Sequence, residues 1–496
     1  MKKITGTRLV LLIFLVFSFM FSIPQKIEND NCSIENNPRL GYYFFYSYAY
    51  EWDVTWSYPG IEFCNDMVLD SSDNVYLVGK TSDHYDPYRE LIVKFDKNGT
   101  PIWNYIGDLG EFDGVDLDSN GNVYVINSYE LKKFNSIGTL NWSKTFPTEL
   151  KTLYITKEND ILLAGGAGSY FLMKCNISGD IEWNCTWNGA VGAQIQVDEL
   201  KNVYVVGTTS KYGAGGSDAC LVKINASGEF EWFRTFGGPD ADRGNSLCLA
   251  HNRTIFIAGS IQIKGSDSDM FAAKFDENGT KLYHKILGNY NRYDTCRSIL
   301  INEEYNGDGD DFYLCGEYYF TGDDRNMAIY SVRGSESGTQ AIFHIWDGKD
   351  EYHPITSEYD SANNIIIAGW LRNTTTGNYD MCYARFGKDS DFDALSDYQE
   401  DTLFHTNKQQ SDSDYDGLTD YEEVKIYHTN PNAQDTDGDG QNDEVEVLNG
   451  FDPNNPFSNG YIGIFIITFS VFGALLGIPI LINVFRKILI KRKHNA

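Results

Sequence analysis

Basic residues are scarce in this chain of 496 residues, with 40 lysines and arginines against 70 aspartates and glutamates and a formal net charge of −30. This balance argues against nucleic acid as a partner, because phosphate backbones are bound by clustered positive charge. Histidine is also sparse: the eight histidines are scattered, and no His-Glu-x-x-His pair occurs. No Gly-x-Ser-x-Gly phrase occurs either. The sequence therefore contains no catalytic constellation of these two common types.

The chain begins with a basic and then apolar stretch. An apolar run over residues 9–21 follows the basic residues Lys2, Lys3 and Arg8. This form is typical of a secretory signal and is short for a membrane span, which needs about 20 apolar residues. No clear small-x-small cleavage site follows the run. We interpret residues 1–23 as a signal peptide or an uncleaved signal anchor.

The other end of the chain predicts a membrane anchor. Residues 461–485 form a stretch of 25 residues without a charge, which is long enough for a transmembrane helix. The tail 486–496 follows, and positive charge beside a span marks the cytoplasmic side. Its basic residues are Arg486, Lys487, Lys491, Arg492 and Lys493. We therefore expect a single-pass protein of the cell membrane, with its ectodomain outside and its C-terminus in the cytoplasm.

Cysteines and glycosylation signals fit an exported segment. The number of cysteines is nine, so at least one is free or pairs between chains. Cys175 and Cys185 flank a predicted hairpin turn and could meet across it as a disulfide. Asn-x-Ser/Thr sequons predict a surface glycoprotein and occur at Asn31, Asn98, Asn141, Asn176, Asn184, Asn225, Asn252, Asn278 and Asn373.

An internal repeat organises most of the chain. One short apolar phrase, written Asn-Val-Tyr-Leu-Val-Gly at residues 74–79, recurs at residues 122–127, 160–165, 202–207, 254–259, 311–316 and 364–369. A second phrase follows most copies, clearest as Leu91-Ile-Val-Lys-Phe95 with Gly99 and Trp103. The order predicts strand, loop, strand, tight glycine turn and strand, with the aromatic residue packing one sheet on the next.

These units predict an all-β fold, a seven-bladed β-propeller over residues 24–388. A unit of this length cannot bury both faces of its sheet alone, whereas seven arranged radially can. The seventh copy lacks its last strand, but residues 51–56 closely match residues 182–187, the outer strand of the third copy. We infer that the N-terminal segment supplies the missing strand and closes the ring, which removes exposed edges.

The repeat resembles the seven-bladed propeller repeat of prokaryotic surface proteins, often called the SBBP-type repeat. The similarity rests on Gly207-Thr-Thr-Ser210, Gly215-Gly-Ser-Asp-Ala219, Leu221-Val-Lys-Ile224 and Thr235-Phe-Gly-Gly238. It covers roughly residues 50–388 and implies a fold and a surface setting, without a particular activity.

Three acidic phrases in a 23-residue period follow at residues 389–456 and predict Ca²⁺ sites. Ca²⁺ takes six to eight oxygen ligands, which a 12-residue loop can supply from positions 1, 3, 5, 7, 9 and 12. Here positions 1, 3, 5 and 9 are Asp and position 12 is Glu. The candidate metal ligands are Asp389, Asp391, Asp393, Asp397 and Glu400; Asp412, Asp414, Asp416, Asp420 and Glu423; and Asp435, Asp437, Asp439, Asp443 and Glu446.

The spacing of these loops argues against EF-hands, because only 11 residues separate one loop from the next. Position 6, where the chain must turn sharply, is Gly417 and Gly440 in the second and third loops but Ala394 in the first, which predicts a weaker first site. The segment resembles the thrombospondin type 3-like calcium repeats of prokaryotic surface proteins, which implies a small calcium-stiffened rod. Without metal, we expect a solvated, self-repelling chain.

A recurring aspartate precedes the third strand of three units, at Asp218, Asp269 and Asp380. These residues should lie on one face of the propeller, where loops commonly carry function. The simpler interpretation, which we favour, is that each aspartate caps its own loop through the backbone.

Two functions follow from this organisation. The first is a membrane-anchored surface protein for binding or adhesion, whose propeller meets an extracellular protein or glycan ligand on a calcium-stabilised stalk. The second is an extracytoplasmic propeller enzyme that acts on glycans or as a quinone-linked dehydrogenase. The fold alone does not distinguish them.

Overall fold

The computed structural model describes residues 48–458 apart from short gaps at 58–59, 84–85, 167–168, 189–190, 251, 265–266, 289–292, 302–311, 320–324, 333–339 and 347–349. The predicted signal segment, the predicted membrane span and the basic tail lie outside the described residues. Within the described part of the chain, no helix is long and apolar enough to cross a membrane.

The described strands form seven antiparallel sheets of four strands each. In chain order, the first four sheets contain β2 (Ile61–Leu69), β3 (Val75–Ser82), β4 (Arg89–Phe95) and β5 (Pro101–Leu109); β6 (Gly114–Leu117), β7 (Val123–Ile126), β8 (Glu130–Phe134) and β9 (Leu140–Thr145); β10 (Leu150–Ile155), β11 (Ile161–Gly165), β12 (Ser169–Cys175) and β13 (Ile181–Asn188); and β14 (Val191–Val197), β15 (Val203–Thr209), β16 (Asp218–Ile224) and β17 (Phe230–Phe236).

The remaining three sheets continue the same pattern along the chain. They contain β18 (Arg243–Leu249), β19 (Ile255–Lys264), β20 (Asp267–Phe275) and β21 (Lys281–Leu287); β22 (Thr295–Ile301), β23 (Phe312–Tyr319), β24 (Arg325–Val332) and β25 (Gln340–Trp346); and β26 (Glu351–Tyr359), β27 (Ile365–Arg372), β28 (Tyr379–Lys388) and β1 (Tyr48–Trp56).

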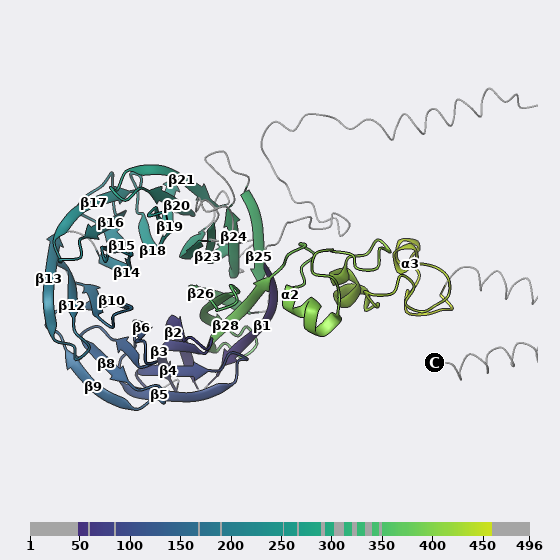
Figure 1. Cartoon of the computed structure of the whole chain (residues 1–496), viewed down its shortest axis with the longest axis horizontal. Helices are drawn as coiled ribbons and strands as arrows, with labels where there is room; N and C mark the ends of the chain where they lie inside the picture. Colours follow the sequence, from purple (N-terminus) through teal and green to yellow (C-terminus); the bar gives the residue numbers. More distant parts are fainter. Residues whose placement is uncertain are drawn as a thin grey trace, which may run out of the picture. The chain divides into compact units, whose positions relative to one another are not determined.

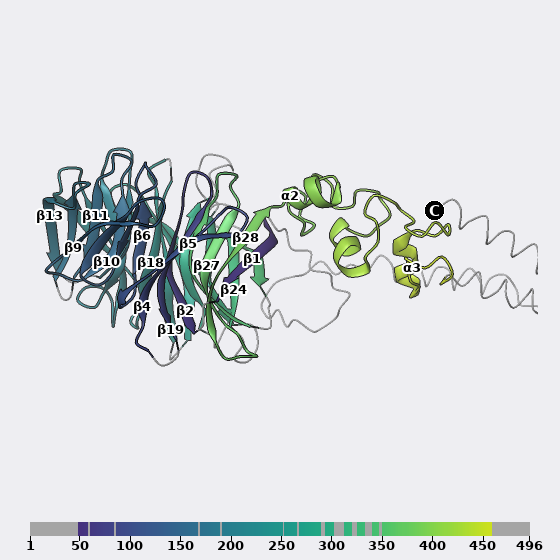
Figure 2. The same cartoon turned by 90° about the horizontal axis from the view of Figure 1, so that it is seen from below.

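The sheets stand around a ring, each with its first strand toward the centre and its fourth at the rim (Figure 1). Figure 2 shows the ring from the side, with the strands running between its two faces. This arrangement is an all-β propeller, as predicted. The recurring apolar phrase is the second strand of each sheet, which is buried in every described copy.

The ring is closed by strands from the two ends of the propeller segment. β1 pairs antiparallel with β28, with Tyr48 opposite Lys388 and Trp56 opposite Met381. The seventh sheet therefore consists of three strands from residues 351–388 and one from residues 48–56. The predicted closure by an N-terminal strand is confirmed, and the pairing covers the edge of β28.

A tryptophan on the outer strand of one sheet packs on the glycine turn of the next. A Cβ atom added to Gly138 would lie 2.8 Å from the indole of Trp103, and one added to Gly228 would lie 2.6 Å from the indole of Trp183. Only glycine fits under the ring, and these turns have positive φ as well. The glycine and the tryptophan of the second phrase therefore recur because the tryptophan of one sheet packs on the glycine of the next.

A polar network explains why the polar residues of the repeat recur. In the first sheet, the carboxylate of Asp70 accepts hydrogen bonds from the side-chain amide of Asn74 and the hydroxyl of Tyr76, and pairs with Lys94 at 3.3 Å. The second sheet repeats it around Asp118, with Asn122, Tyr124 and Lys133. The asparagine and tyrosine of the first phrase and the lysine of the second therefore meet at one aspartate.

The predicted meeting of Cys175 and Cys185 is wrong. All eight cysteines among the described residues are free thiols. The register places Cys175 opposite Ile181 and Cys185 opposite Leu172, so the two cysteines lie at different levels of the paired strands. Of the predicted glycosylation sites, the eight described asparagines are all at least partly exposed to solvent.

Three carboxylates on inner strands join neighbouring sheets. Asp66 accepts a hydrogen bond from the amide of Val115 at 3.0 Å, and Asp116 accepts one from the amide of Ile155 at 2.6 Å. Glu358 accepts one from the amide of Leu69 at 3.0 Å. Desolvation raises the pKa of both aspartates to about 7 and the pKa of Glu358 to about 8.

These raised pKa values predict that the propeller loses stability as pH rises. A carboxyl whose pKa is higher in the folded than in the unfolded state stabilises the fold at low pH, and this contribution is lost as pH rises through the folded value. Glu358→Gln keeps an acceptor but cannot ionise, so the stability lost between pH 5 and pH 9 should shrink by roughly 1 kcal/mol or more. The measurement is the unfolding midpoint against pH at constant calcium. Glu229→Gln, on an exposed turn, is the control; equal pH profiles for the two variants would contradict the assignment.

Candidate metal centre

Each acidic phrase folds as a loop followed by a short helix. The helices are α2 (Asp397–Gln399), which continues as the π-helix η1 (Glu400–Phe404), then the π-helix η2 (Glu422–Tyr427), and α3 (Asp443–Asn449). Ser396 caps α2, since its hydroxyl accepts from the amide of Gln399 and the side chain of Gln399 accepts from the amide of Ser396. The glutamate at position 12 of every loop therefore lies on a helix.

The aspartate at position 1 fixes the shape of each loop. In the second loop, Asp412 accepts hydrogen bonds from the amides of Tyr415 and Gly417 at 2.7 and 3.0 Å. Asp389 and Asp435 accept from the residues at the same two positions of their own loops. The loop is thereby wound around its first carboxylate, which brings the next two aspartates to the same side.

The three leading aspartates of each loop converge. One oxygen from each lies within 4.8 Å of the others in the sets Asp389, Asp391 and Asp393; Asp412, Asp414 and Asp416; and Asp435, Asp437 and Asp439. In each of the three repeats, at least one carboxylate oxygen of the residue at position 3 and one of the residue at position 12 has no hydrogen-bond partner among the described residues. They belong to Asp391, Asp414 and Asp437 and to Glu400, Glu423 and Glu446.

The glutamates at position 12 are fully buried although one oxygen of each is unpartnered. Burial and the neighbouring aspartates raise the pKa of Glu400 to about 9, that of Glu423 to about 8 and that of Glu446 to about 7. A buried carboxylate without a counterion is unfavourable by several kcal/mol. Oxygen donors alone, converging in this number, fit a hard divalent cation, and Ca²⁺ in particular. When bound, the ion would supply the missing positive charge.

A single 12-residue loop predicts that the aspartate at position 9 serves its own loop, but Asp443 lies beside the preceding repeat. Asp443 accepts hydrogen bonds from the amide and hydroxyl of Thr436 at 2.9 and 2.7 Å. One of its oxygens also lies within 4.8 Å of Asp416 and Glu423, both from the preceding repeat. Asp416 in turn accepts from the amide of Glu444 at 3.3 Å. The second candidate site is therefore shared between two repeats.

The first repeat is joined to the second in the same manner. Asp393 accepts from the amide of Tyr421 at 3.2 Å, and Asp420 is among the charges that raise the pKa of Asp393 to about 7. Asp397, by contrast, accepts from the amide and hydroxyl of Ser390 at 2.9 and 2.8 Å and belongs to none of the converging sets. Sequence reasoning missed the sharing, because it joins residues of two different repeats.

The third repeat ends differently. In the first two repeats, a threonine after the helix donates to the position-12 glutamate, as Thr429 does to Glu423 at 3.1 Å. In the third, Ser458 donates to Glu446 at 3.4 Å. Residues 452–458 therefore resemble the start of another repeat. Within the described residues, however, no aspartate from a following repeat joins the set Asp435, Asp437 and Asp439.

The residue at the sharp turn of position 6 differs between the first loop and the other two. φ is 110° at Gly417 and 96° at Gly440, in the left-handed region that glycine adopts without strain. Ala394 has φ 81° at the same position. An alanine is disfavoured there by about 1–2 kcal/mol, which weakens the first loop relative to the others.

Comparisons with known proteins support the assignment of the second and third repeats. Residues 412–434 and 435–456 match the family model of the bacterial TSP3 repeat. No curated protein matches the chain. The two parts of the chain with established character are therefore a propeller and repeats of a calcium-binding type.

Similar solved structures include a protein of unknown function from Bacteroides caccae, with 14% identity, a TM-score of 0.34 and coverage of 48% of this chain and 85% of that one. The Pan2 WD40 domain of Neurospora crassa has 9% identity, a TM-score of 0.47 and coverage of 69% and 97%. The Dos1 propeller has 10% identity, a TM-score of 0.43 and coverage of 68% and 95%. At these scores, the description of the fold rests on the strand pairing of this chain.

Sharing between repeats predicts the effect of removing Asp443. In a chain of residues 24–458, Asp443→Asn should lower calcium affinity at the second loop by about tenfold or more, because that site loses a charged ligand. Segment-resolved hydrogen exchange during calcium titration reports protection of residues 412–423 and 435–446 separately. Asp401→Asn, an exposed carboxylate outside the three sets, is the control. A loss confined to the third loop would show that Asp443 serves its own loop.

Proposed function

We propose that this chain is a membrane-anchored cell-surface binding or adhesion protein that presents its propeller on a calcium-stabilised stalk. The observation that carries the proposal is the set of unpartnered carboxylate oxygens at the same positions of three consecutive repeats. Support for the anchor comes from the uncharged run at residues 461–485 and the basic tail after it. The ligand class that we propose is an extracellular protein or glycan, which the loops of the propeller face would contact.

Stiffening by calcium follows from the composition of the repeats. Buried apolar side chains are few in the described part of residues 389–458: Leu395, Leu418, Pro431 and Pro453. Such a segment has almost no hydrophobic core, so its folding is coupled to ion binding. Because a site is shared between two repeats, one bound ion would fix the angle between them.

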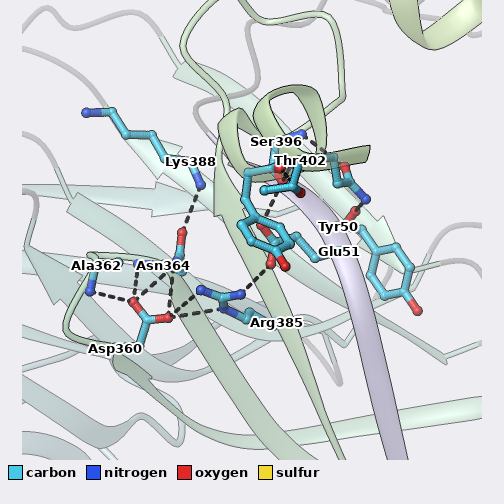
Figure 3. Close-up of polar contacts among 11 residues, drawn as sticks. Tyr50, Glu51, Asp360, Ala362, Asn364, Arg385, Lys388, Ser396 and Thr402 are labelled. Carbon is cyan, nitrogen blue, oxygen red and sulfur yellow. Dashed lines mark hydrogen bonds and ion pairs between the residues drawn. The ribbon is translucent and has the colours of Figure 1, made fainter. Parts of the chain in front are cut away.

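The first repeat is also joined to the seam of the propeller. Ser396, which caps the helix carrying Glu400, donates its hydroxyl to Glu51 of β1 at 2.7 Å (Figure 3). Glu51 pairs at its other oxygen with Arg385 of β28 at 2.8 Å, and Arg385 pairs with Asp360 at 3.0 Å. The strand that closes the ring thus contacts the repeat that would bind the first ion.

A second contact strengthens this junction. The side-chain amide of Gln399 donates to the backbone carbonyl of Tyr50 at 3.3 Å, and the guanidinium of Arg385 lies 5.9 Å from the ring centre of Tyr398. Burial raises the pKa of Glu51 despite its two polar partners. A buried carboxylate held from both sides transmits order in the repeat to the propeller seam.

Calcium removal tests the stalk. In a chain of residues 24–458, a chelator should increase the maximum dimension and flexibility seen by small-angle scattering, because the carboxylates repel one another without the ion. The triple variant Glu400→Gln, Glu423→Gln and Glu446→Gln should show reduced calcium binding, with Asp401→Asn as the control. Identical scattering with and without the chelator would refute a calcium-dependent stalk.

The junction predicts a calcium effect on the propeller itself. Ser396→Ala leaves Glu51 without one hydrogen bond, which should destabilise the propeller by about 1–3 kcal/mol and reduce its stabilisation by calcium. Calorimetric unfolding with and without calcium measures both effects. The control is Thr402→Ala, because the hydroxyl of Thr402 donates within its own helix, to the carbonyl of Tyr398. Equal behaviour of the two variants would mean that the repeat and the seam are independent.

A further inference from the structure

Two buried aspartates from adjacent sheets face one another in the loops of the propeller, far along the chain from the acidic repeats. Asp218 begins β16 and is 1% exposed, and Asp242 directly precedes β18 and is fully buried. These strands belong to neighbouring sheets of the ring (Figure 1). The amide of Asp242 donates to the carbonyl of Ser217 at 2.6 Å, and the hydroxyl of Ser217 donates to the carbonyl of Asp242 at 3.3 Å. The backbone therefore holds the two aspartates together.

The hydrogen bonds of the two carboxylates leave negative charge uncompensated. Oδ1 of Asp218 accepts one long hydrogen bond, from the amide of Ala214 at 3.3 Å, and Oδ2 of Asp218 has no partner among the described residues. Asp242 accepts from the amides of Gln262 and Gly238. None of the ion pairs found in the described part of the chain includes either aspartate. Capping of the loop accounts for one oxygen of Asp218 only.

Glycines form the wall against which the carboxylates converge. A Cβ atom added to Gly237 would lie 2.3 Å from Oδ2 of Asp242 and 2.4 Å from Oδ1 of Asp218, so the two oxygens are separated by less than the sum of these distances. A Cβ atom added to Gly213 would lie 2.1 Å from Oδ2 of Asp218. A side chain at Gly213 or Gly237 would therefore collide with the two carboxylates. Burial, then the charges of Asp218 and Asp240, raise the pKa of Asp242.

We propose that Asp218 and Asp242 form a Ca²⁺ site between the fourth and fifth sheets, independent of the acidic repeats. The two carboxylates would supply the charged ligands, Oδ2 of Asp218 foremost, and backbone carbonyls of the glycine loops and water would complete the six to eight oxygens that Ca²⁺ takes. Nitrogen and sulfur donors take no part in the proposed set, which favours a hard cation over zinc. The ion would join two sheets at the loop face of the ring.

The next pair of sheets repeats the backbone arrangement. The amide of Asp294 donates to the carbonyl of Ser268 at 2.7 Å, and a Cβ atom added to Gly288 would lie 2.1 Å from Oδ1 of Asp269. The proposal concerns Asp218 and Asp242, whose uncompensated charge is the observation that points to an ion.

Hydrogen exchange on the unaltered chain of residues 1–496 tests the site without a mutation. Calcium should slow exchange of the amides of residues 211–218 and 237–243, in addition to any protection of residues 389–458. The two regions report separately, so failure of the repeats to bind and failure of this site are distinguishable. Protection confined to the repeats would overturn the proposal.

Matched variants test the ligands. Asp218→Asn and Asp242→Asn should each bind one Ca²⁺ per chain fewer than the unaltered protein in equilibrium dialysis. Asp198→Asn is the control, because Asp198 lies in the same sheet but its carboxylate accepts from Asn202 and Tyr204. Equal stoichiometry in all three variants would overturn the proposal. If either variant does not fold, the exchange experiment decides.

Discussion

At five junctions among the described residues, the indole of an outer-strand tryptophan rests on the glycine turn of the following sheet, and the packing of these sheets depends on this contact. It orders the sheets in one direction, because the tryptophan and the glycine lie on opposite sides of every sheet that carries both. At the seam, a Cβ atom added to Gly99 of the first sheet would lie 3.6 Å from Trp52 of β1. The closing strand thus brings the same tryptophan that the other sheets use. Where it occurs, this contact packs the face of one sheet against the next.

The acidic repeats are built on a different physical basis. The propeller buries apolar strands between sheets, whereas the repeats bury carboxylates around positions that only positive charge can stabilise. Hydrophobic burial needs no bound ion, whereas we propose that the order of the repeats depends on one. Glu51 lies where the two parts meet, paired with Arg385 of the propeller and with Ser396 of the first repeat.

Prediction from the sequence succeeded where the structure repeats a local pattern. The alternation of strand phrases and glycine turns located the sheets, and the match of residues 51–56 to an outer strand located the seam. It failed where register decides a contact. Cys175 and Cys185 flank one turn, yet the register of β12 and β13 places each opposite another residue. The contact of Asp443 with the preceding repeat was also not predicted, because the 12-residue loop pattern describes each repeat by itself.

The sequence by itself determined the all-β architecture, its closure and the identity of the clustered carboxylates, because each follows from spacing along the chain. Only the tertiary structure decided which repeat uses Asp443, and that Ser396 contacts Glu51. It also brought Asp218 beside Asp242 across two sheets. These contacts join residues of different loops and sheets, and they depend on how loops pack after the strands have paired. The local sequence pattern determines the strands and helices, whereas their packing determines which charged residues come together.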